Sequence, residues 1–101
     1  MSIKIMTEVW DHHFERPIDK MVLLAIADNA NDERIAWPSI DTIVKKCSSS
    51  NSTVHRSIQW LKQHHYVDRY ENKRGQLTFE ILAIEHRAGP VSQNGTPPKS
   101  D

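Results

Sequence analysis

Residues 39–65 constrain the fold of this chain more than any other stretch. They read SIDTIVKKCSSSNSTVHRSIQWLKQHH, in which two amphipathic runs flank three consecutive serines. Apolar residues recur at intervals of three to four in both runs, which is the repeat of a helix that buries one stripe. These residues are Ile40, Ile43, Val44 and Cys47 in the first run, and Val54, Ile58 and Leu61 in the second. We expect two short helices, each of which buries one face.

The polar segment between the two runs predicts a tight turn. Residues 48–51, SSSN, interrupt the helical pattern and supply side chains that can cap the next helix, with Ser50 as the expected cap. Ser39 is placed to cap the first helix. Helix, short turn and helix is the order of a motif whose second helix enters the major groove of DNA. The stretch therefore predicts DNA binding.

The distribution of charge supports this expectation, although 13 basic and 13 acidic residues leave no net charge. Residues 1–44 carry 4 Lys/Arg and 8 Asp/Glu (−4), residues 45–76 carry 7 and 2 (+5), and residues 77–101 carry 2 and 3 (−1). Phosphate binding depends on one electropositive face more than on a high pI, and a basic block inside an acidic frame predicts such a face. The alternative is an ordinary solvated surface.

Length and composition limit the class of protein. A chain of 101 residues with 38% apolar content fits one domain with a modest core. It has no run of 18 apolar residues, and MSIKIMTEVW lacks the basic start and apolar stretch of a secretory signal. Cys47 is the single cysteine, which excludes an internal disulfide and fits a reducing compartment. We expect a cytoplasmic protein without a membrane partner.

The first 16 residues predict a short strand or irregular arm and then a short helix. Residues 2–6 alternate apolar and polar side chains, and Thr7 is placed to cap a helix over residues 7–14. Trp10 and Phe14 lie four apart, so this helix should carry both on one face.

The stretch after Pro17 predicts the central helix of the domain. Asp19 is placed to cap a helix over residues 20–29. Apolar residues fill nearly all faces of this helix, as is typical of a helix surrounded by the rest of its domain. Residues 29–34 are polar and predict a loop, after which Trp37 is expected to pack on the core.

Residues 66–82 predict a β-hairpin. Two runs of aromatic and branched residues flank NKRGQ, a turn-forming segment with Lys73 and Arg74 at its tip. From residue 88 onward the chain is rich in Gly, Pro, Ser and amides and predicts a disordered tail or the start of a linker. The sequence thus predicts one domain over residues 1–87, mainly α with a small β-hairpin.

These elements resemble the winged helix-turn-helix domains at the N-termini of phage replication initiators and in small phage or plasmid regulators. The resemblance rests on MVLLAIADNANDE, WPSIDTIVKKC and SNSTVHRSIQWLKQHHYV with the following hairpin, and covers roughly residues 6–84. Two positions depart from the family pattern. Ser49 stands where the turn usually has an apolar residue, and His65 where a Gly often ends the second helix.

The resemblance implies a winged helix-turn-helix fold and sequence-specific binding of double-stranded DNA, with replication initiation of a phage or other mobile element as the favoured role. Transcriptional regulation and plasmid partition are alternatives. An alternative of another class is a protein-interaction module within a replication complex. Replication proteins are expected partners, and residues 7–14 are the expected contact of a homodimer.

Helical geometry assigns the expected DNA contacts. With the apolar stripe inward, the residues expected to face bases are Asn51, Ser52, His55, Arg56 and Gln59. The residues expected at phosphates or in the minor groove are Thr53, Lys62, Lys45, Lys46, Lys73 and Arg74. Arg56 suits guanine, and Gln59 or Asn51 suits adenine, because each side chain can form two hydrogen bonds to the base edge.

Each assignment has a simpler alternative. Arg56 could pair with an acid such as Asp41, Gln59 could be solvated, and Lys73 and Arg74 could serve only to keep a hairpin tip soluble.

Other chemistry has little support in the sequence. The histidines are His12, His13, His55, His64, His65 and His86. Adjacent histidines on a helix project about 100° apart, so they do not form the i, i+4 pair of helical metal sites. Cys47 lies on an apolar face and is interpreted as a small core residue. The three glycines form no phosphate loop. We expect no enzyme activity, no metal site and no cofactor.

Overall fold

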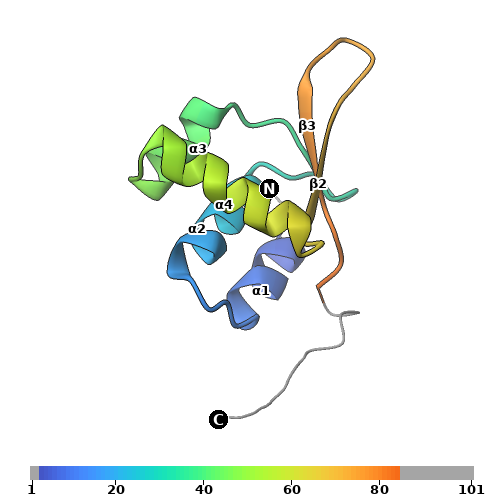
Figure 1. The fold of residues 1–101 in the computed structure, drawn as a ribbon. Helices are drawn as coiled ribbons and strands as arrows, with labels where there is room; N and C mark the ends of the chain where they lie inside the picture. Colours follow the sequence, from blue (N-terminus) through green and yellow to red (C-terminus); the bar gives the residue numbers. More distant parts are fainter. Residues whose placement is uncertain (1–2, 85–101) are drawn as a thin grey trace.

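The computed structural model describes residues 3–84, which form four helices and a three-stranded sheet (Figure 1). The elements are α1 (Ile3–Asp11), α2 (Pro17–Asp28), β1 (Ile35–Ala36), α3 (Ile40–Cys47), α4 (Asn51–Gln63), β2 (Val67–Glu71) and β3 (Leu77–Ile81). This confirms the predicted fold class, a mainly α domain with a small β-hairpin and a winged helix-turn-helix arrangement. The predicted domain end at residue 87 and the tail 88–101 lie outside the described residues. No helix in residues 3–84 is long and apolar enough to cross a membrane.

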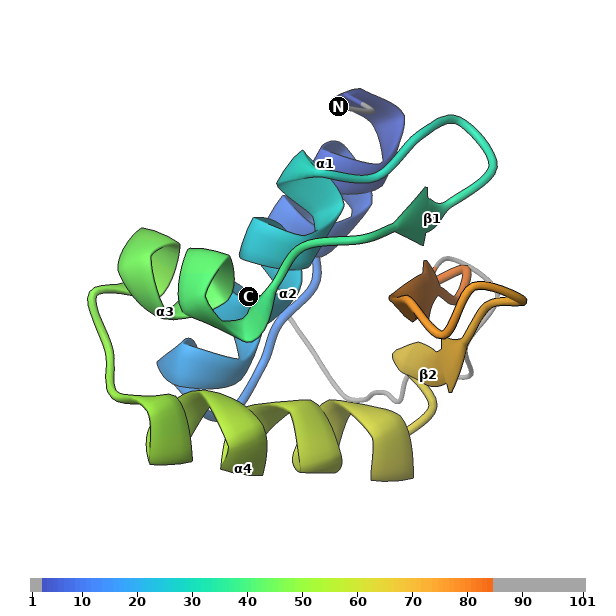
Figure 2. The same cartoon turned by 90° about the horizontal axis from the view of Figure 1, so that it is seen from above.

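The core surrounds α2, which lies between α1 and the α3–α4 pair (Figure 2). Every residue of α2 from Val22 to Ala27 is buried, which confirms the prediction of a central helix. Ile43 from α3 and Ile58 and Leu61 from α4 are also buried. The apolar stripes predicted for the two helices of residues 39–65 therefore face this core, as expected from their spacing.

The strand or arm predicted for residues 2–6 is wrong over residues 3–6, because α1 begins at Ile3. Ile5 and Val9 lie four residues apart and are 2% and 0% exposed, so a helix that starts at Ile3 buries both on one face. Thr7 is inside this helix and is not its cap, since its hydroxyl donates to the carbonyl oxygen of Ile3 at 2.8 Å. Phe14 lies beyond the end of α1 and is buried, whereas Trp10 is 57% exposed.

The predicted cap of the central helix is also wrong. The helix begins at Pro17, three residues before the predicted start, because the fixed φ of proline and its missing N–H suit the first turn. Arg16 holds the cap position and makes no side-chain capping bond. Asp19 lies in the first turn, where its side chain is fully buried.

The hairpin is confirmed at both strands. β2 and β3 pair antiparallel from Val67 opposite Ile81 to Glu71 opposite Leu77. The Asn72 side chain accepts from the backbone N–H groups of Arg74 and Gln76, and Gly75 adopts φ +75°. These local bonds and the left-handed glycine close the turn.

A third strand, β1, was not predicted. It is only two residues long and pairs antiparallel with β3, with Ile35 opposite Glu80. It also explains why the packing predicted for Trp37 is wrong. Successive side chains of an extended chain point to opposite sides, and Ala36 and Pro38 are buried, so Trp37 between them is 44% exposed.

Candidate nucleic-acid interface

The turn between α3 and α4 is built by serines. Ser39 accepts a hydrogen bond from the N–H of Thr42 at 3.1 Å, and Ser50 accepts from the N–H of Thr53 at 3.2 Å. Both predicted caps are therefore confirmed. Between them Ser48 adopts the left-handed conformation with φ 50°, which reverses the chain at the end of α3. The N–H of half-buried Ser49 donates to the carbonyl oxygen of Val44 at 3.2 Å.

The end of α4 is equally defined. His65 has φ 63°, the left-handed conformation that a glycine often supplies at this position. The N–H of Tyr66 donates to the carbonyl oxygen of Leu61 at 2.8 Å, a bond that closes the last turn of the helix. The hairpin follows directly, so α4 is fixed at one end by the serine turn and at the other by the sheet.

One side of α4 is open to solvent. In Figure 2 this helix lies along the edge of the domain, with no other helix or strand beyond it. Opposite the buried stripe, the exposed residues are Ser52, Arg56, Gln59, Lys62 and Gln63. We refer to these five residues as the outer side of α4. Arg56 forms no ion pair within residues 3–84, so the alternative pairing with Asp41 is not present.

The other residues predicted on this helix lie around the outer side. Asn51 is exposed in the first turn, and His55 is half-buried at the edge of the face. Thr53 is half-buried, and its hydroxyl oxygen accepts from the hydroxyl of Ser50 at 2.8 Å. Thr53 is therefore bonded to Ser50 through both its backbone N–H and its hydroxyl.

Two further predicted cations lie at the end of α3, next to the serine turn. Lys45 and Lys46 are both exposed in its last turn. Lys46 forms an ion pair with Asp28 at the end of α2. Because this pair is on the surface, it is weak enough to exchange for another anion.

The remaining predicted cations, Lys73 and Arg74, lie apart from these. Both are exposed at the tip of the hairpin, which projects beyond the helices from the end of α4 (Figure 1). The predicted residues of α3 and α4 therefore lie on two adjoining helices. Lys73 and Arg74 form a separate basic site at the hairpin tip.

The sequence of the α3–α4 region contains no acidic residue from Thr42 to Val67. This interval carries Lys45, Lys46, Arg56 and Lys62, while the nearest acids along the chain are Asp41 and Asp68. An uninterrupted cationic stretch on an exposed helix and its adjoining turn attracts polyanions.

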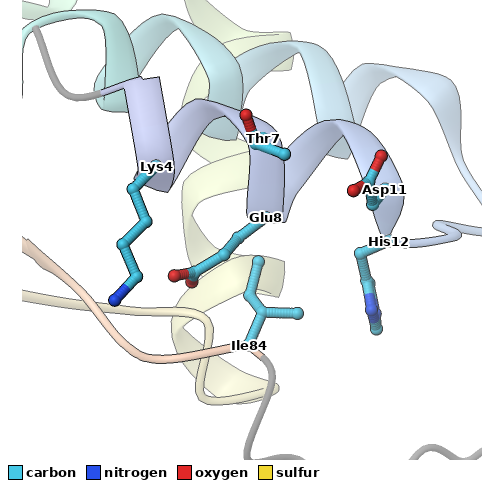
Figure 3. Close-up of a pocket in the computed structure, with 6 residues that line it drawn as sticks. All are labelled: Lys4, Thr7, Glu8, Asp11, His12 and Ile84. Carbon is cyan, nitrogen blue, oxygen red and sulfur yellow. The ribbon is translucent and has the colours of Figure 1, made fainter.

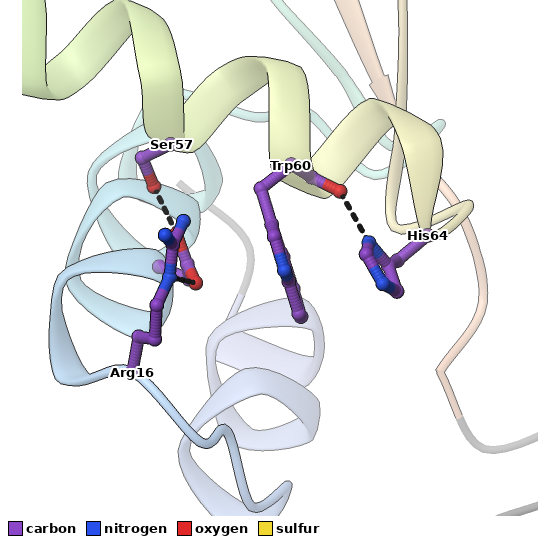
Figure 4. A network of polar contacts seen from close by, with 5 residues as sticks. Arg16, Ser57, Trp60 and His64 are labelled. Carbon is purple, nitrogen blue, oxygen red and sulfur yellow. Dashed lines mark hydrogen bonds and ion pairs between the residues drawn. The ribbon is translucent and has the colours of Figure 1, made fainter.

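Sequence reasoning missed the polar contacts on another side of α4. Asp19 is 0% exposed, and its carboxylate accepts hydrogen bonds from the Arg16 Nε at 2.6 Å and from the Ser57 hydroxyl at 2.6 Å. Figure 4 shows Ser57 and Trp60 projecting from the same side of α4 toward Arg16. The hydrogen bonds to Asp19 raise the pKa of Arg16. The only sequence signal for this network was a serine inside the apolar stripe of α4.

Trp60 packs among aromatic and cationic side chains next to α4. The indole is half-buried against the core and stacks on the ring of His64 with centroids 3.9 Å apart. The Tyr66 ring lies 5.8 Å away, and the Arg16 guanidinium carbon is 5.6 Å from the indole centroid. Trp60 therefore packs beside the start of the hairpin and the segment before α2.

A second polar junction joins α1 to the sheet. Arg34 donates to the carboxylate of Glu8 at 2.7 Å and to the carbonyl oxygen of Ile81 at 2.6 Å. The hydrogen bond from Arg34 lowers the pKa of Glu8. Glu8 also lines an open cavity of about 520 Å³ (Figure 3), together with Lys4, Thr7, Asp11, His12 and Ile84. This lining mixes both signs of charge, and most of it belongs to α1, with none from α4.

The described residues hold no group of three or more His, Cys, Asp or Glu side chains that could bind a metal ion. Cys47 is half-buried beside the core, and burial raises the pKa of its thiol. A raised pKa keeps the thiol protonated and unreactive at neutral pH.

Comparison with known proteins agrees with this architecture. Residues 16–67 match the helix-turn-helix domain family, a range that contains α2, β1, α3 and α4 and ends at the first residue of β2. Protein YmfN of Escherichia coli (strain K12) is 32% identical over 87 residues, which is 83% of this chain and 19% of that protein. The chain thus spans about a fifth of the length of this relative.

Proposed function

Because this chain belongs to the helix-turn-helix domain family, we propose that it binds double-stranded DNA through the outer side of α4, without enzymatic activity. The observation that carries the proposal is that this exposed side lies on a stretch without acids, next to the cations of α3. A helix of this kind fits the major groove, which is about 12 Å wide.

Base reading is assigned to the first three turns of α4. Arg56 is exposed and forms no ion pair within residues 3–84, so its guanidinium is available for the O6 and N7 of guanine. Gln59 follows one turn later on the same side, and exposed Asn51 and Ser52 precede it. The side-chain amide of Gln59 or of Asn51 can pair with the N6 and N7 of adenine. His55 lies at the edge of this face.

Phosphate contacts are assigned to the cations around this face. Lys45 and Lys46 flank the start of α4, and Lys62 lies in its last turn. Lys46 would exchange Asp28 for a phosphate. Thr53 could contribute its hydroxyl at the same end. Lys73 and Arg74 project from the hairpin tip, where they would contact backbone or the minor groove.

The direct experiment is binding of the full chain to random-sequence duplex DNA over a range of salt concentrations, followed by selection of bound sequences. We expect affinity to fall steeply with salt and one motif to be enriched. Steep salt dependence without a motif would limit the function to non-specific DNA binding. Absence of binding at low salt would favour the protein-interaction alternative, in which the basic residues have no nucleic-acid ligand.

The biological role we favour is replication initiation of a phage or other mobile element, in company with replication proteins. The support is the resemblance of residues 6–84 to the N-terminal domains of phage replication initiators. Several copies of the selected motif in direct repeat would support an origin. A single inverted repeat would support an operator and hence transcriptional regulation. Sites beside a partition locus would support plasmid partition.

We also propose a homodimer through α1. Ile3 and Trp10, seven residues apart on one face, are 76% and 57% exposed. Lys4 and Asp11, also seven apart, are exposed beside them. Seven residues are close to two helical turns, so two antiparallel copies of α1 would place each Lys4 near Asp11 of the other copy.

A charge-swap series tests this dimer by sedimentation equilibrium. Lys4→Glu and Asp11→Lys should each weaken association, because like charges then face each other, and the double variant should restore it. Both changes suit the helix dipole, so the fold of α1 should be preserved. Glu33→Lys in the exposed loop before β1 is the matched control. A monomer at all concentrations would refute the contact.

A further inference from the structure

The polar network on the inner flank of α4 links this helix to the start of α2. Asp19 is fully buried, and its carboxylate oxygens accept from the Nε and a terminal nitrogen of Arg16 at 2.6 and 2.8 Å. The Ser57 hydroxyl donates to the same carboxylate at 2.6 Å, across 38 positions of the chain. A buried carboxylate is costly unless it is paired and hydrogen-bonded, so both donors help to stabilise Asp19 in the folded domain.

These bonds are directional, whereas the other buried residues of α2 and α4 are apolar. Apolar burial depends mainly on area and permits small rotations or shifts of one helix on another. Ser57 is 1% exposed and has a single hydroxyl, which must remain within hydrogen-bond distance of Asp19. One helical position corresponds to a rotation of about 100°. Ser57 therefore fixes the rotation of α4 on α2.

Arg16 provides a second contact one turn further along α4. Its guanidinium carbon lies 5.6 Å from the centroid of the Trp60 ring, while its nitrogens donate to Asp19 (Figure 4). Trp60 stacks in turn on His64. One arginine thus holds α4 at Ser57, through Asp19, and at Trp60. Contacts at two points along a helix restrict its tilt as well as its rotation.

We propose that Asp19, Arg16 and Ser57 are positioning residues that set the angle at which α4 presents its outer side to DNA. This inference rests on the proposed function for its effect on DNA. Arg56 is the neighbour of Ser57 in the chain, and Gln59 lies two residues beyond it. A rotation of α4 therefore displaces both base-reading side chains, although Ser57 and Asp19 themselves touch no DNA.

The decisive variant is Ser57→Ala, which removes one hydrogen bond with little change in volume. Residual dipolar couplings measured by NMR on the full chain without DNA should show a changed angle between α2 and α4. With DNA, the affinity ratio between the selected duplex and a random-sequence duplex should fall by about fivefold or more, because displaced base-reading side chains lose at least the lower limit of one bidentate base contact. Affinity for the random duplex and its salt dependence should change less, because Lys45, Lys46, Lys73 and Arg74 lie outside α4 and keep their positions.

Val9→Ala is the matched control, because it removes buried volume from α1 and takes no donor or acceptor from the hydrogen bonds of the network. It should lower stability but leave both the interhelical angle and the affinity ratio unchanged. An unchanged angle in Ser57→Ala would overturn the proposal, and so would an equal loss of the affinity ratio in Val9→Ala. If the wild-type chain enriches no sequence, base reading by α4 is refuted, and the angle measurement alone decides whether the network positions the helix.

Discussion

The two flanks of α4 differ in how their polar groups are satisfied. On the inner flank, the Ser57 hydroxyl bonds to a buried carboxylate and Trp60 stacks on a neighbouring ring. On the outer side, Arg56 has no ion pair within residues 3–84, and Gln59 is exposed. Both flanks belong to one 13-residue helix, so helix formation alone does not explain the difference.

The difference indicates that one flank of this helix holds the domain together and that the other is available to bind a ligand. A side chain whose polar atoms are satisfied inside the domain contributes to structure, because breaking its bonds leaves a buried group unpaired. A side chain that exposes donors on a rigid helix can bind a ligand without first losing an internal bond. Substitutions on the two flanks should therefore affect different quantities, and the following predictions test that separation.

The largest effect is expected from the buried stripe. Ile58→Ala removes a side chain that is 1% exposed, and it should lower the free energy of unfolding by about 2–5 kcal/mol. Chemical denaturation provides the measurement. Among molecules that remain folded, the preference for the selected duplex over random DNA should persist. Full retention of stability would mean that the phase assigned to α4 is wrong.

The outer side should show the opposite pattern. Arg56→Ala, two residues away, should leave stability within about 0.5 kcal/mol of wild type, as for other surface substitutions. Binding to the selected duplex should weaken by about 1–3 kcal/mol, with relaxed preference at one base. Competition binding with single-base variants measures this. Equal weakening on every sequence would show that Arg56 contacts phosphate instead.

A smaller effect is expected at the hairpin tip. Lys73→Ala removes one exposed cation at the hairpin tip, which projects away from α3 (Figure 1). Affinity should fall on all sequences, and the slope of log affinity against log salt should decrease by about 1. An unchanged slope would remove the hairpin from the interface and restrict binding to α3 and α4.

The smallest effect concerns the Glu8–Arg34 junction, which lies outside α4. Because Arg34 lowers the pKa of Glu8 in the folded state, this pair stabilises the fold above the ordinary carboxyl pKa of about 4.3. That stabilisation is lost as pH falls through the folded pKa. Glu8→Gln should lower stability by about 1 kcal/mol at neutral pH.

The stability difference between Glu8→Gln and wild type should disappear in acid, as urea denaturation at a series of pH values would show. A difference that is constant with pH would indicate that the ion pair is not its cause. Preference for the selected duplex should not change, because the hydrogen bonds of this junction join α1 to the end of β3.

Residues 39–65 were predictable because their signals are local. The caps at Ser39 and Ser50 act over three residues, and the apolar repeat reports directly which face is buried. The hairpin was predictable for a similar reason, since residues 72–76 have a turn composition and close the turn with their own side chains. The exposure of Arg56 and Gln59 followed from the helix phase alone.

The features that were mispredicted or missed depend on distant parts of the chain. β1 is too short to carry a sequence pattern and exists as a strand because β3 pairs with it. Residues 2–6 alternate like a strand, but docking on α2 selects a helix that buries Ile5 and Val9 together. Asp19 resembled a cap, and its actual partner Ser57 is 38 positions away. No local rule connects these two residues.

The most direct test of α4 as the DNA-reading helix is an NMR titration of the chain with the selected duplex, followed through backbone and side-chain shifts. We expect the largest changes at Ser52, Arg56, Gln59 and Lys62, with smaller changes at the hairpin tip and at the end of α3. The inner flank at Ser57 and Trp60 should change little. Changes confined to α1 or to the inner flank would contradict the assignment and place the DNA on another surface.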